Sequence, residues 1–168
     1  MKERVTLTLD NDVLNRVDGT VDGFKIKNRS HAIELLLMQA MGNSKPRTAL
    51  VLAGGLGTRL KPITNEIPKP LLPVHDKTIL EHNFDLLKKY CIRHILLSIG
   101  YKANNINDYF GSGKNFGVEI TYLEETKPLG TAGPLNLARP YITETFITCN
   151  ADELKDLNLY DMYLFHKE

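Results

Sequence analysis

The strongest constraint on the fold is an alternation of strand-like and helix-like segments that begins after residue 47. Strands are predicted by short apolar runs at residues 49–52, 92–99, 118–123 and 145–148. Segments with the apolar spacing of helices lie between and after them, at residues 80–90, 104–110, 131–138 and from 157 onward. Strands that alternate with helices form right-handed βαβ units, so we predict an α/β domain with a mostly parallel sheet. Ligands of such sheets bind at the carboxyl ends of the strands.

The composition is typical of an ordinary folded domain. Of the 168 residues, 42% are hydrophobic and 24% are charged, which allows a packed core, and the net charge of +1 does not in itself point to nucleic acid or membrane. No apolar stretch approaches the roughly 20 residues that span a bilayer, and residues 1–10 lack the apolar run of a signal peptide. Cys91 and Cys149 match no metal or redox spacing. We expect two buried thiols in a cytoplasmic protein with no membrane partner.

The segment at residues 42–47, GNSKPR, divides the chain. Its glycine, asparagine, serine and proline residues interrupt both helices and strands, which is typical of a linker. We therefore predict a small module over residues 1–44 and the α/β domain over residues 45–168.

A glycine-rich loop follows the first predicted strand of the α/β domain. It has the sequence LAGGLGTRL at residues 52–60, and PKPLLP follows at residues 68–73. Glycines let the backbone approach a phosphate chain closely, while Arg59 and Lys69 can bind phosphate oxygens. The loop is neither a P-loop nor a dinucleotide-binding fingerprint, because the spacing of both motifs is absent. We interpret the GSGK at residues 111–114 as a surface turn, since Asn115 stands where a P-loop requires Ser or Thr.

These two segments resemble the signature of the sugar nucleotidyltransferases, the NDP-sugar pyrophosphorylases. The resemblance implies a Rossmann-like nucleotidyltransferase sheet. It also implies that Arg59 binds the leaving pyrophosphate and that Lys69 contacts phosphate. The residues expected to lie against the nucleotide are Leu52, Ala53, Gly54, Gly55, Gly57 and Thr58.

Two later stretches resemble the same family. The sequence ETKPLGTAGPL at residues 125–135 is similar to the family's second motif, which implies that Glu125, Gly130 and Thr131 border the nucleotide and that a helix opens toward it. The run FITCNAD at residues 146–152 carries an apolar strand into a carboxylate, and Asp152 matches the family's Mg²⁺ ligand. We expect the neighbouring Glu153 to be solvated or to support that ligand.

The resemblance implies an enzyme that forms an NDP-sugar and pyrophosphate from a nucleoside triphosphate and a sugar 1-phosphate. The PLGTAGPL sequence is most similar to guanylyltransferases that act on mannose 1-phosphate. Thymidylyl- and uridylyltransferases that act on glucose 1-phosphate share much of it, so base and sugar stay open. The family's domain is usually longer than the segment after residue 47. We therefore expect a fragment that binds nucleotide weakly or does not turn over.

The front module, residues 3–41, resembles a ribbon-helix-helix DNA-binding domain. An alternating strand, RVTLTL, precedes two short helices for which Asp10 and Ser30 are the expected N-caps. The resemblance implies a homodimer, because two chains must pair their strands to make the ribbon. Val5, Leu7 and Leu9 would then face the core. The residues expected to contact duplex DNA are Arg4, Thr6, Thr8, Arg29 and Ser30.

The charge of this module favours DNA binding only weakly. Residues 1–47 hold eight Lys and Arg against six Asp and Glu. The module could therefore serve for dimerisation alone. The alternative function for the whole chain is a ribbon-helix-helix regulator whose catalytically incomplete transferase half senses a nucleotide.

Overall fold

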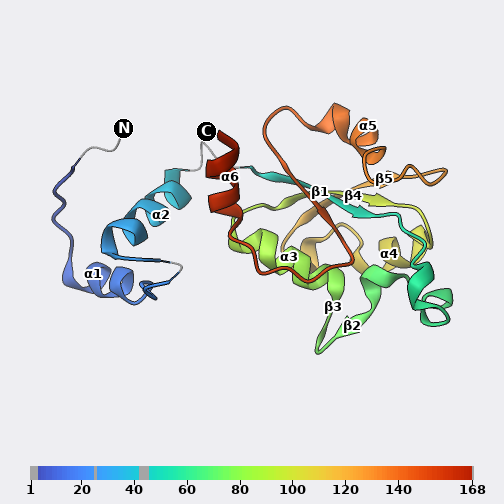
Figure 1. The fold of residues 1–168 in the computed structure, drawn as a ribbon, viewed down its shortest axis with the longest axis horizontal. Coiled ribbons are helices and arrows are strands. Elements are labelled where there is room, and N and C mark those ends of the chain that lie inside the picture. The colour runs from blue at the N-terminus through green and yellow to red at the C-terminus, as the bar shows by residue number, and fades with distance from the viewer. Residues whose placement is uncertain (1–3, 25, 42–45, 168) are drawn as a thin grey trace. The chain divides into compact units, whose positions relative to one another are not determined.

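The computed structural model describes residues 4–24, 26–41 and 46–167. The chain divides into two compact units, Met1–Ser44 and Lys45–Glu168 (Figure 1). The larger unit contains the sheet, and the smaller one contains two helices.

A parallel sheet forms the centre of the C-terminal unit. Within residues 46–167 its strand order is β5-β4-β1-β6, and every neighbouring pair is parallel. The strands are β1 (Thr48–Ala53), β4 (His94–Ile99), β5 (Glu119–Glu124) and β6 (Ile147–Asn150). The parallel α/β prediction is confirmed, and all four carboxyl ends lie at one edge.

The helices of the C-terminal unit follow the predicted alternation. They are α3 (Ile79–Lys89), α4 (Ala103–Phe110), α5 (Pro134–Ala138) and α6 (Leu159–Lys167). Helix α5 is shorter than predicted, because residues 131–133 form a turn and the helix begins at Pro134, whose ring suits a first helical position. The predicted turn at residues 111–114 is confirmed, since residues 111 and 112 form a turn and residues 111, 112 and 114 are exposed, although Gly113 is buried.

Short elements that the sequence did not predict fill the connections. A hairpin of β2 (Pro73–Val74) and β3 (Lys77–Thr78) leads into α3. Helix α3 starts with a capping box, in which the Thr78 Oγ accepts from the Glu81 N–H at 3.2 Å and the Thr78 N–H donates to Glu81 at 2.6 Å. The single-turn 3₁₀ helices are Thr58–Leu60, Ile63–Asn65, Lys69–Leu71, Lys114–Phe116 and Arg139–Tyr141.

Both faces of the sheet are covered by apolar side chains. Alternate residues of β1 point to opposite faces, so Ala49 and Val51 join one core cluster while Leu50 joins the other. The larger cluster includes residues of α3, α4 and α6, whereas the smaller one includes residues of α5. Figure 1 shows α3 and α5 on opposite sides of the sheet. The sheet is therefore fixed from both faces, which positions the loops at its edge.

The N-terminal unit consists of α1 (Asn11–Asp18) and α2 (Arg29–Met41). Asp10 is confirmed as the cap of α1, since its carboxylate accepts from the Asp12 N–H at 2.8 Å. The prediction that Ser30 caps α2 is wrong. Asn28 performs that role, because its side chain accepts from the His31 N–H at 3.0 Å and the helix starts one residue before Ser30.

The predicted strand at residues 5–9 belongs to no sheet within the described part of the chain. Its apolar side chains do not face a core, and Val5, Leu7 and Leu9 are 70%, 52% and 38% exposed. A strand requires a hydrogen-bonded neighbour, and neither α1 nor α2 offers one. Among the described residues of this unit, the buried apolar side chains are Val17 and Ala32.

The cysteines differ from the expected pair of buried thiols. Cys91 is exposed, and Cys149 is partly buried. Burial raises the pKa of the Cys149 thiol, an effect that the nearby Lys155 charge opposes. No helix within the described residues has the length and apolar character needed to cross a bilayer.

Candidate active site

A cavity of about 550 Å³ opens at the carboxyl edge of the sheet. Its walls come from the segments that follow β1, β5 and β6, together with the short helix at Lys69. The twelve residues predicted to bind nucleotide or take part in catalysis all line it: Leu52, Ala53, Gly54, Gly55, Gly57, Thr58, Arg59, Lys69, Glu125, Gly130, Thr131 and Asp152. The structure thus brings together segments up to 100 positions apart.

The start of the glycine loop packs directly against Glu125. A side chain at Gly54 would overlap the Glu125 carboxylate, so any larger residue there would require Glu125 to shift. Glu125 is itself held from two sides, because it accepts from the Ser98 hydroxyl at 2.7 Å and from the Leu129 N–H at 3.1 Å. Ser98 is fully buried in β4. The loop and the second family motif therefore form one wall of the cavity.

The middle of the glycine loop is held by Thr64. The Thr64 hydroxyl donates to the Gly57 carbonyl at 2.8 Å, and the Tyr101 hydroxyl donates to the Thr64 carbonyl at 3.1 Å. Gly57 has φ of 63°, and a Cβ there would lie 2.9 Å from the Thr64 Cγ2. Thr64 is fully buried, so the loop has a fixed support beneath it.

The charged groups of the cavity include a direct ion pair. The Lys69 Nζ lies 2.7 Å from the Asp152 Oδ2, and the two side chains are 28% and 39% exposed. Arg59 lies in the short helix that follows the glycine loop, and it is exposed. Arg59 and Lys69 therefore offer two cations for phosphate oxygens, and three carboxylates, those of Glu125, Asp152 and Glu153, also line the cavity.

Several residues of the site were not predicted from the sequence. Four further residues line the cavity, namely Leu56, Pro70, Pro128 and Asn150, and Glu153, which was expected beside Asp152, lines it as well. Ser98 and Thr64 support it from behind. Ser98 had a detectable signal, because it is a hydroxyl residue inside the apolar run of β4. Thr64 had none, since a threonine in a connecting segment is unremarkable.

The residues predicted to contact DNA lie in the N-terminal unit. Arg4, Thr8, Arg29 and Ser30 line a broad groove of about 1240 Å³ that Val5, Leu7 and Leu9 also line. Thr6 is exposed and is not part of this lining. Two bonds of 2.6 Å join the Arg29 guanidinium to Asp18 of α1. These bonds lower the pKa of Asp18 and raise that of Arg29.

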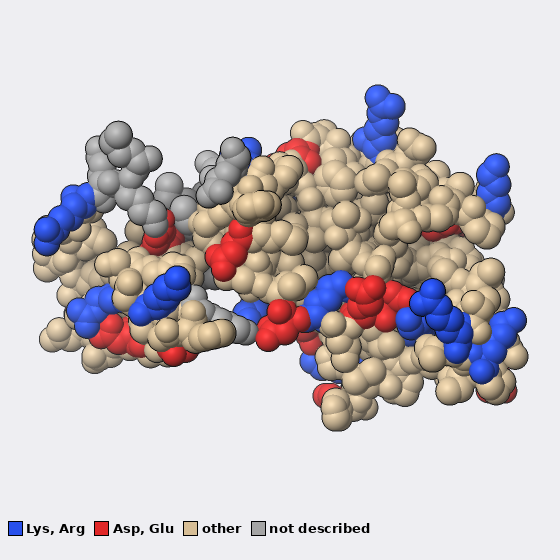
Figure 2. Space-filling view, viewed as in Figure 1, with Lys and Arg blue, Asp and Glu red and all other residues tan. Residues whose placement is uncertain are grey.

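The surface of the N-terminal unit carries charges of both signs. On the face seen in Figure 2, its Lys and Arg side chains stand beside Asp and Glu side chains. A duplex-binding surface is ordinarily dominated by basic groups. The visible face thus adds no support to the prediction of DNA binding.

The C-terminal unit is similar in sequence to known sugar-1-phosphate nucleotidyltransferases. The chain is 41% identical over 123 residues to mannose-1-phosphate guanyltransferase beta-B from Xenopus laevis. This match covers 71% of this chain and 34% of that protein. It is 36% identical over 132 residues to UTP–glucose-1-phosphate uridylyltransferase from Synechocystis, with coverage of 71% and 34%. The chain thus spans about a third of the length of these relatives.

A solved structure and a family model agree with these matches. The crystal structure of HddC from Yersinia pseudotuberculosis complexed with GMP-PN superimposes with a TM-score of 0.63 and 33% identity, over 72% of this chain and 54% of that one. The model of the family described as nucleotidyl transferase matches residues 48–168, which include the whole cavity. The chain therefore belongs to the nucleotidyl transferase family.

Proposed function

We propose that the C-terminal unit binds a nucleoside triphosphate along the glycine loop. It would be the nucleotide-binding part of a sugar-1-phosphate nucleotidyltransferase. The observation that carries this proposal is the convergence of Arg59, Lys69 and Asp152 with that loop around one cavity. Glycine backbones can turn their N–H groups toward phosphate oxygens, and the two cations offset phosphate charge. Family membership supports the same conclusion.

In the proposed reaction, an oxygen of the sugar 1-phosphate attacks the α-phosphorus of the triphosphate. A new oxygen–phosphorus bond forms, the bond to the bridging oxygen of the β-phosphate breaks, and pyrophosphate leaves with that electron pair. The attacking phosphate is already anionic, so the step requires no general base. Arg59 would offset charge on the leaving pyrophosphate, and Lys69 would steady the remaining phosphate oxygens.

The donor set at the end of β6 fits a magnesium ion that arrives with the nucleotide. The Asp152 carboxylate is 39% exposed and lines the cavity. No group of three or more His, Cys, Asp and Glu within the described residues could enclose a metal ion. Mg²⁺ in nucleotide sites takes one or two carboxylates and completes its ligands with phosphates and water. We propose Asp152 as its protein ligand, where a bound Mg²⁺ would offset phosphate charge.

Pyrophosphate release tests this function. The match covers about a third of the relatives, so the test uses a version of the protein that carries residues beyond 168. In that protein we expect release from GTP and mannose 1-phosphate in the presence of Mg²⁺, and its loss in Arg59→Ala and Asp152→Ala. The matched controls are Arg139→Ala and Asp108→Ala, which change exposed residues away from the cavity. Release that persists in both cavity variants would contradict the assigned roles.

Guanine is the base that we propose. The guanyltransferase relative and the GMP-PN complex of HddC support it, whereas the uridylyltransferase relative keeps uracil as the alternative. Thermal shifts with GTP, UTP, dTTP and CTP in the presence of Mg²⁺ decide between them, because a ligand that binds the folded state raises its melting temperature. The largest shift is expected with GTP.

For the N-terminal unit we propose homodimerisation through residues 4–10. The supporting observation is the exposure of Val5, Leu7 and Leu9 beside a groove that the same residues line. A second copy could pair its own residues 4–10 with this segment and cover those side chains. Sedimentation at several protein concentrations tests the dimer.

A DNA-binding regulator with a nucleotide-sensing transferase half is the rival function. The position of Arg4 and Thr8 on the same groove favours it, since strand pairing would place them on a shared surface. A salt-dependent shift of duplex DNA that disappears in Arg4→Ala with Thr6→Ala would support this rival. Pyrophosphate release without any DNA shift would exclude it.

A further inference from the structure

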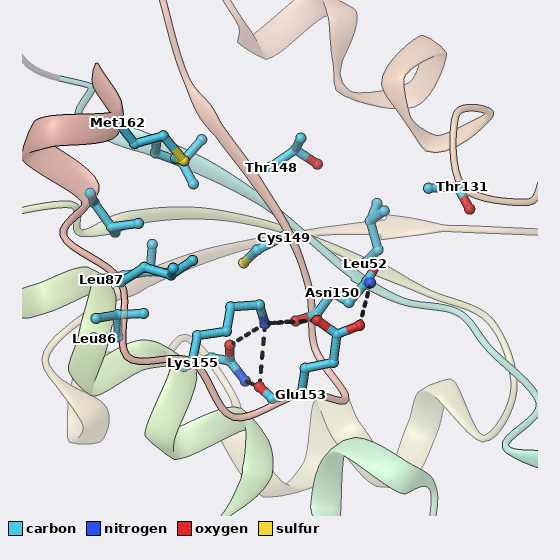
Figure 3. Close-up of a pocket in the computed structure, with 14 residues that line it drawn as sticks. Leu52, Leu86, Leu87, Thr131, Thr148, Cys149, Asn150, Glu153, Lys155 and Met162 are labelled. Carbon is cyan, nitrogen blue, oxygen red and sulfur yellow. Dashed lines mark hydrogen bonds and ion pairs between the residues drawn. The ribbon is translucent and has the colours of Figure 1, made fainter. Parts of the chain in front are cut away.

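Lys155, which has no role in the proposed reaction, forms hydrogen bonds that hold the loop carrying Asp152. The Lys155 Nζ donates to the Asn150 carbonyl at 2.7 Å, to the Asn83 Oδ1 at 3.0 Å and to the Glu153 carbonyl at 3.3 Å. Its side chain is only 13% exposed. Figure 3 shows this amino group directed toward Asn150 and Glu153. The ammonium has three hydrogens, and each has a protein acceptor.

Asn83 connects this lysine to the body of the fold. It lies in α3, is 3% exposed, and its Nδ2 donates to the Ile79 carbonyl at 2.9 Å and to the Glu153 carbonyl at 3.0 Å. Because its Oδ1 accepts from Lys155, this one buried amide joins the helix, the lysine and the loop. A buried amide with all its partners present holds a single arrangement, since each lost bond would leave a polar group unsatisfied.

The segment that these bonds hold carries Asp152, whose side chain stays 39% exposed. The Asn150 Nδ2 donates to the Glu153 Oε1 at 2.9 Å, which closes the loop across the aspartate. The Ala151 N–H donates to the Leu52 carbonyl at 3.0 Å, which continues the ladder of β1 and β6 by one residue. Lys155 and Asn83 therefore restrain the backbone on both sides of the proposed metal ligand.

We propose that Lys155 and Asn83 are positioning residues that hold the backbone on both sides of Asp152, and so fix where its carboxylate, which is paired with Lys69, meets the nucleotide-bound cation. This inference rests on the proposed function of the cavity. Groups that orient a metal ligand without touching the metal commonly change its affinity by about 10- to 100-fold when they are removed. The competing role for Lys155 is direct contact with a substrate phosphate, which would require it to leave three protein acceptors.

Amide exchange of the protein alone tests the positioning. In Lys155→Met, the Ala151 amide should exchange about tenfold faster, because the loop opens more often. Lys155→Arg should recover part of the protection, and Asn83→Ala should lose it as Lys155→Met does. Lys167→Met changes an exposed lysine of α6 and should leave the exchange as in the wild type. Unchanged exchange in both Lys155→Met and Asn83→Ala overturns the proposal.

The cation requirement tests the link to the site. We would measure the Mn²⁺ concentration that gives half of the GTP-dependent thermal shift, and Lys155→Met should raise it about 10- to 100-fold. The GTP affinity at saturating Mn²⁺ should change by less than about threefold, since the glycine loop is untouched. A large loss of GTP affinity at saturating Mn²⁺ would indicate phosphate contact instead. An unchanged Mn²⁺ requirement would also overturn the proposal.

The two experiments separate the inference from the function on which it rests. A wild-type chain that shows no thermal shift with any triphosphate and Mn²⁺ would reject the proposed function. The exchange rate of Ala151 would still show whether Lys155 holds the loop. A normal GTP-dependent thermal shift in the wild type supports the proposed function. Faster Ala151 exchange and a raised Mn²⁺ requirement in Lys155→Met support the positioning role.

Discussion

The two units of this chain differ in how much apolar surface each can bury. In the C-terminal unit, a four-stranded sheet within residues 46–167 has apolar clusters on both faces. In the N-terminal unit, Val17 and Ala32 are the buried apolar side chains among the described residues, while Val5 and Leu7 are more than half exposed. A unit that fills its own core can fix a site at its edge. A small unit with few buried apolar side chains is only marginally stable by itself, and the proposed dimer would cover its exposed ones.

The largest expected effect comes from breaking the core of the C-terminal unit. Phe84 is 1% exposed and packs edge-on against Phe110, with ring centroids 5.2 Å apart. Phe84→Ala should lower the free energy of unfolding by about 3–5 kcal/mol, because it leaves a cavity between α3 and the sheet. Urea denaturation measures this loss. Phe165→Ala, at a side chain that is 79% exposed, should change it by less than about 0.5 kcal/mol.

A change at the proposed dimer surface of the N-terminal unit should weaken dimerisation. It should leave the folding of the C-terminal unit unchanged. Leu7→Asp puts a charge into the proposed dimer surface and should weaken dimerisation by roughly a hundredfold, since a buried leucine contributes about 1.5–3 kcal/mol. Sedimentation over a range of protein concentrations measures it. Phe24→Asp changes an exposed residue that does not line the groove, and it should leave the dimer intact. A wild-type chain that stays monomeric at all concentrations would reject the dimer.

The site of the C-terminal unit should be sensitive to a side chain added at Gly54. Gly54→Ala forces a methyl group into the Glu125 carboxylate, so GTP affinity should fall about tenfold through displacement of the loop. Gly19→Ala is the control, because Gly19 does not line the cavity and an added Cβ there meets no atom closer than 3.4 Å. Isothermal titration of both variants checks this. Equal affinities would show that Glu125 moves aside at no cost.

The smallest effect concerns pH and the exposed pair that joins α1 to α2. Hydrogen bonding to Arg29 lowers the pKa of Asp18 from 3.8. A lowered carboxyl pKa contributes stability that is full above 3.8 and is lost as the pH falls through the lowered value. Asp18→Asn should therefore speed amide exchange in α1 slightly at neutral pH. The difference from the wild type should vanish in strong acid, and one that persists there would exclude the ion pair as its cause.

The sequence predicted the four strands and the main helices of the C-terminal unit because their signals are local, and the resemblance to a family supplied the expected site residues. Periodicity located the strands, and the residues expected to bind nucleotide all line one cavity. The contacts that fix the site were not predictable, because Lys69 with Asp152 and Asn83 with Lys155 join positions 83 and 72 residues apart. No periodic pattern reports such pairs. The prediction of a strand at residues 5–9 was wrong for a related reason. A strand needs a neighbouring strand to pair with, and an alternating sequence pattern does not show whether one is present.

Equilibrium binding of a nucleotide tests the central claim most directly. The claim is that the glycine loop, Arg59, Lys69 and Asp152 form a binding site for a nucleoside triphosphate. Isothermal titration with GTP and Mg²⁺ should show one site in the wild type. Arg59→Met should weaken it by about tenfold or more, because charge-assisted bonds to phosphate are lost. Failure of the wild-type chain to bind any nucleoside triphosphate, or equal affinity in Arg59→Met, would contradict the claim.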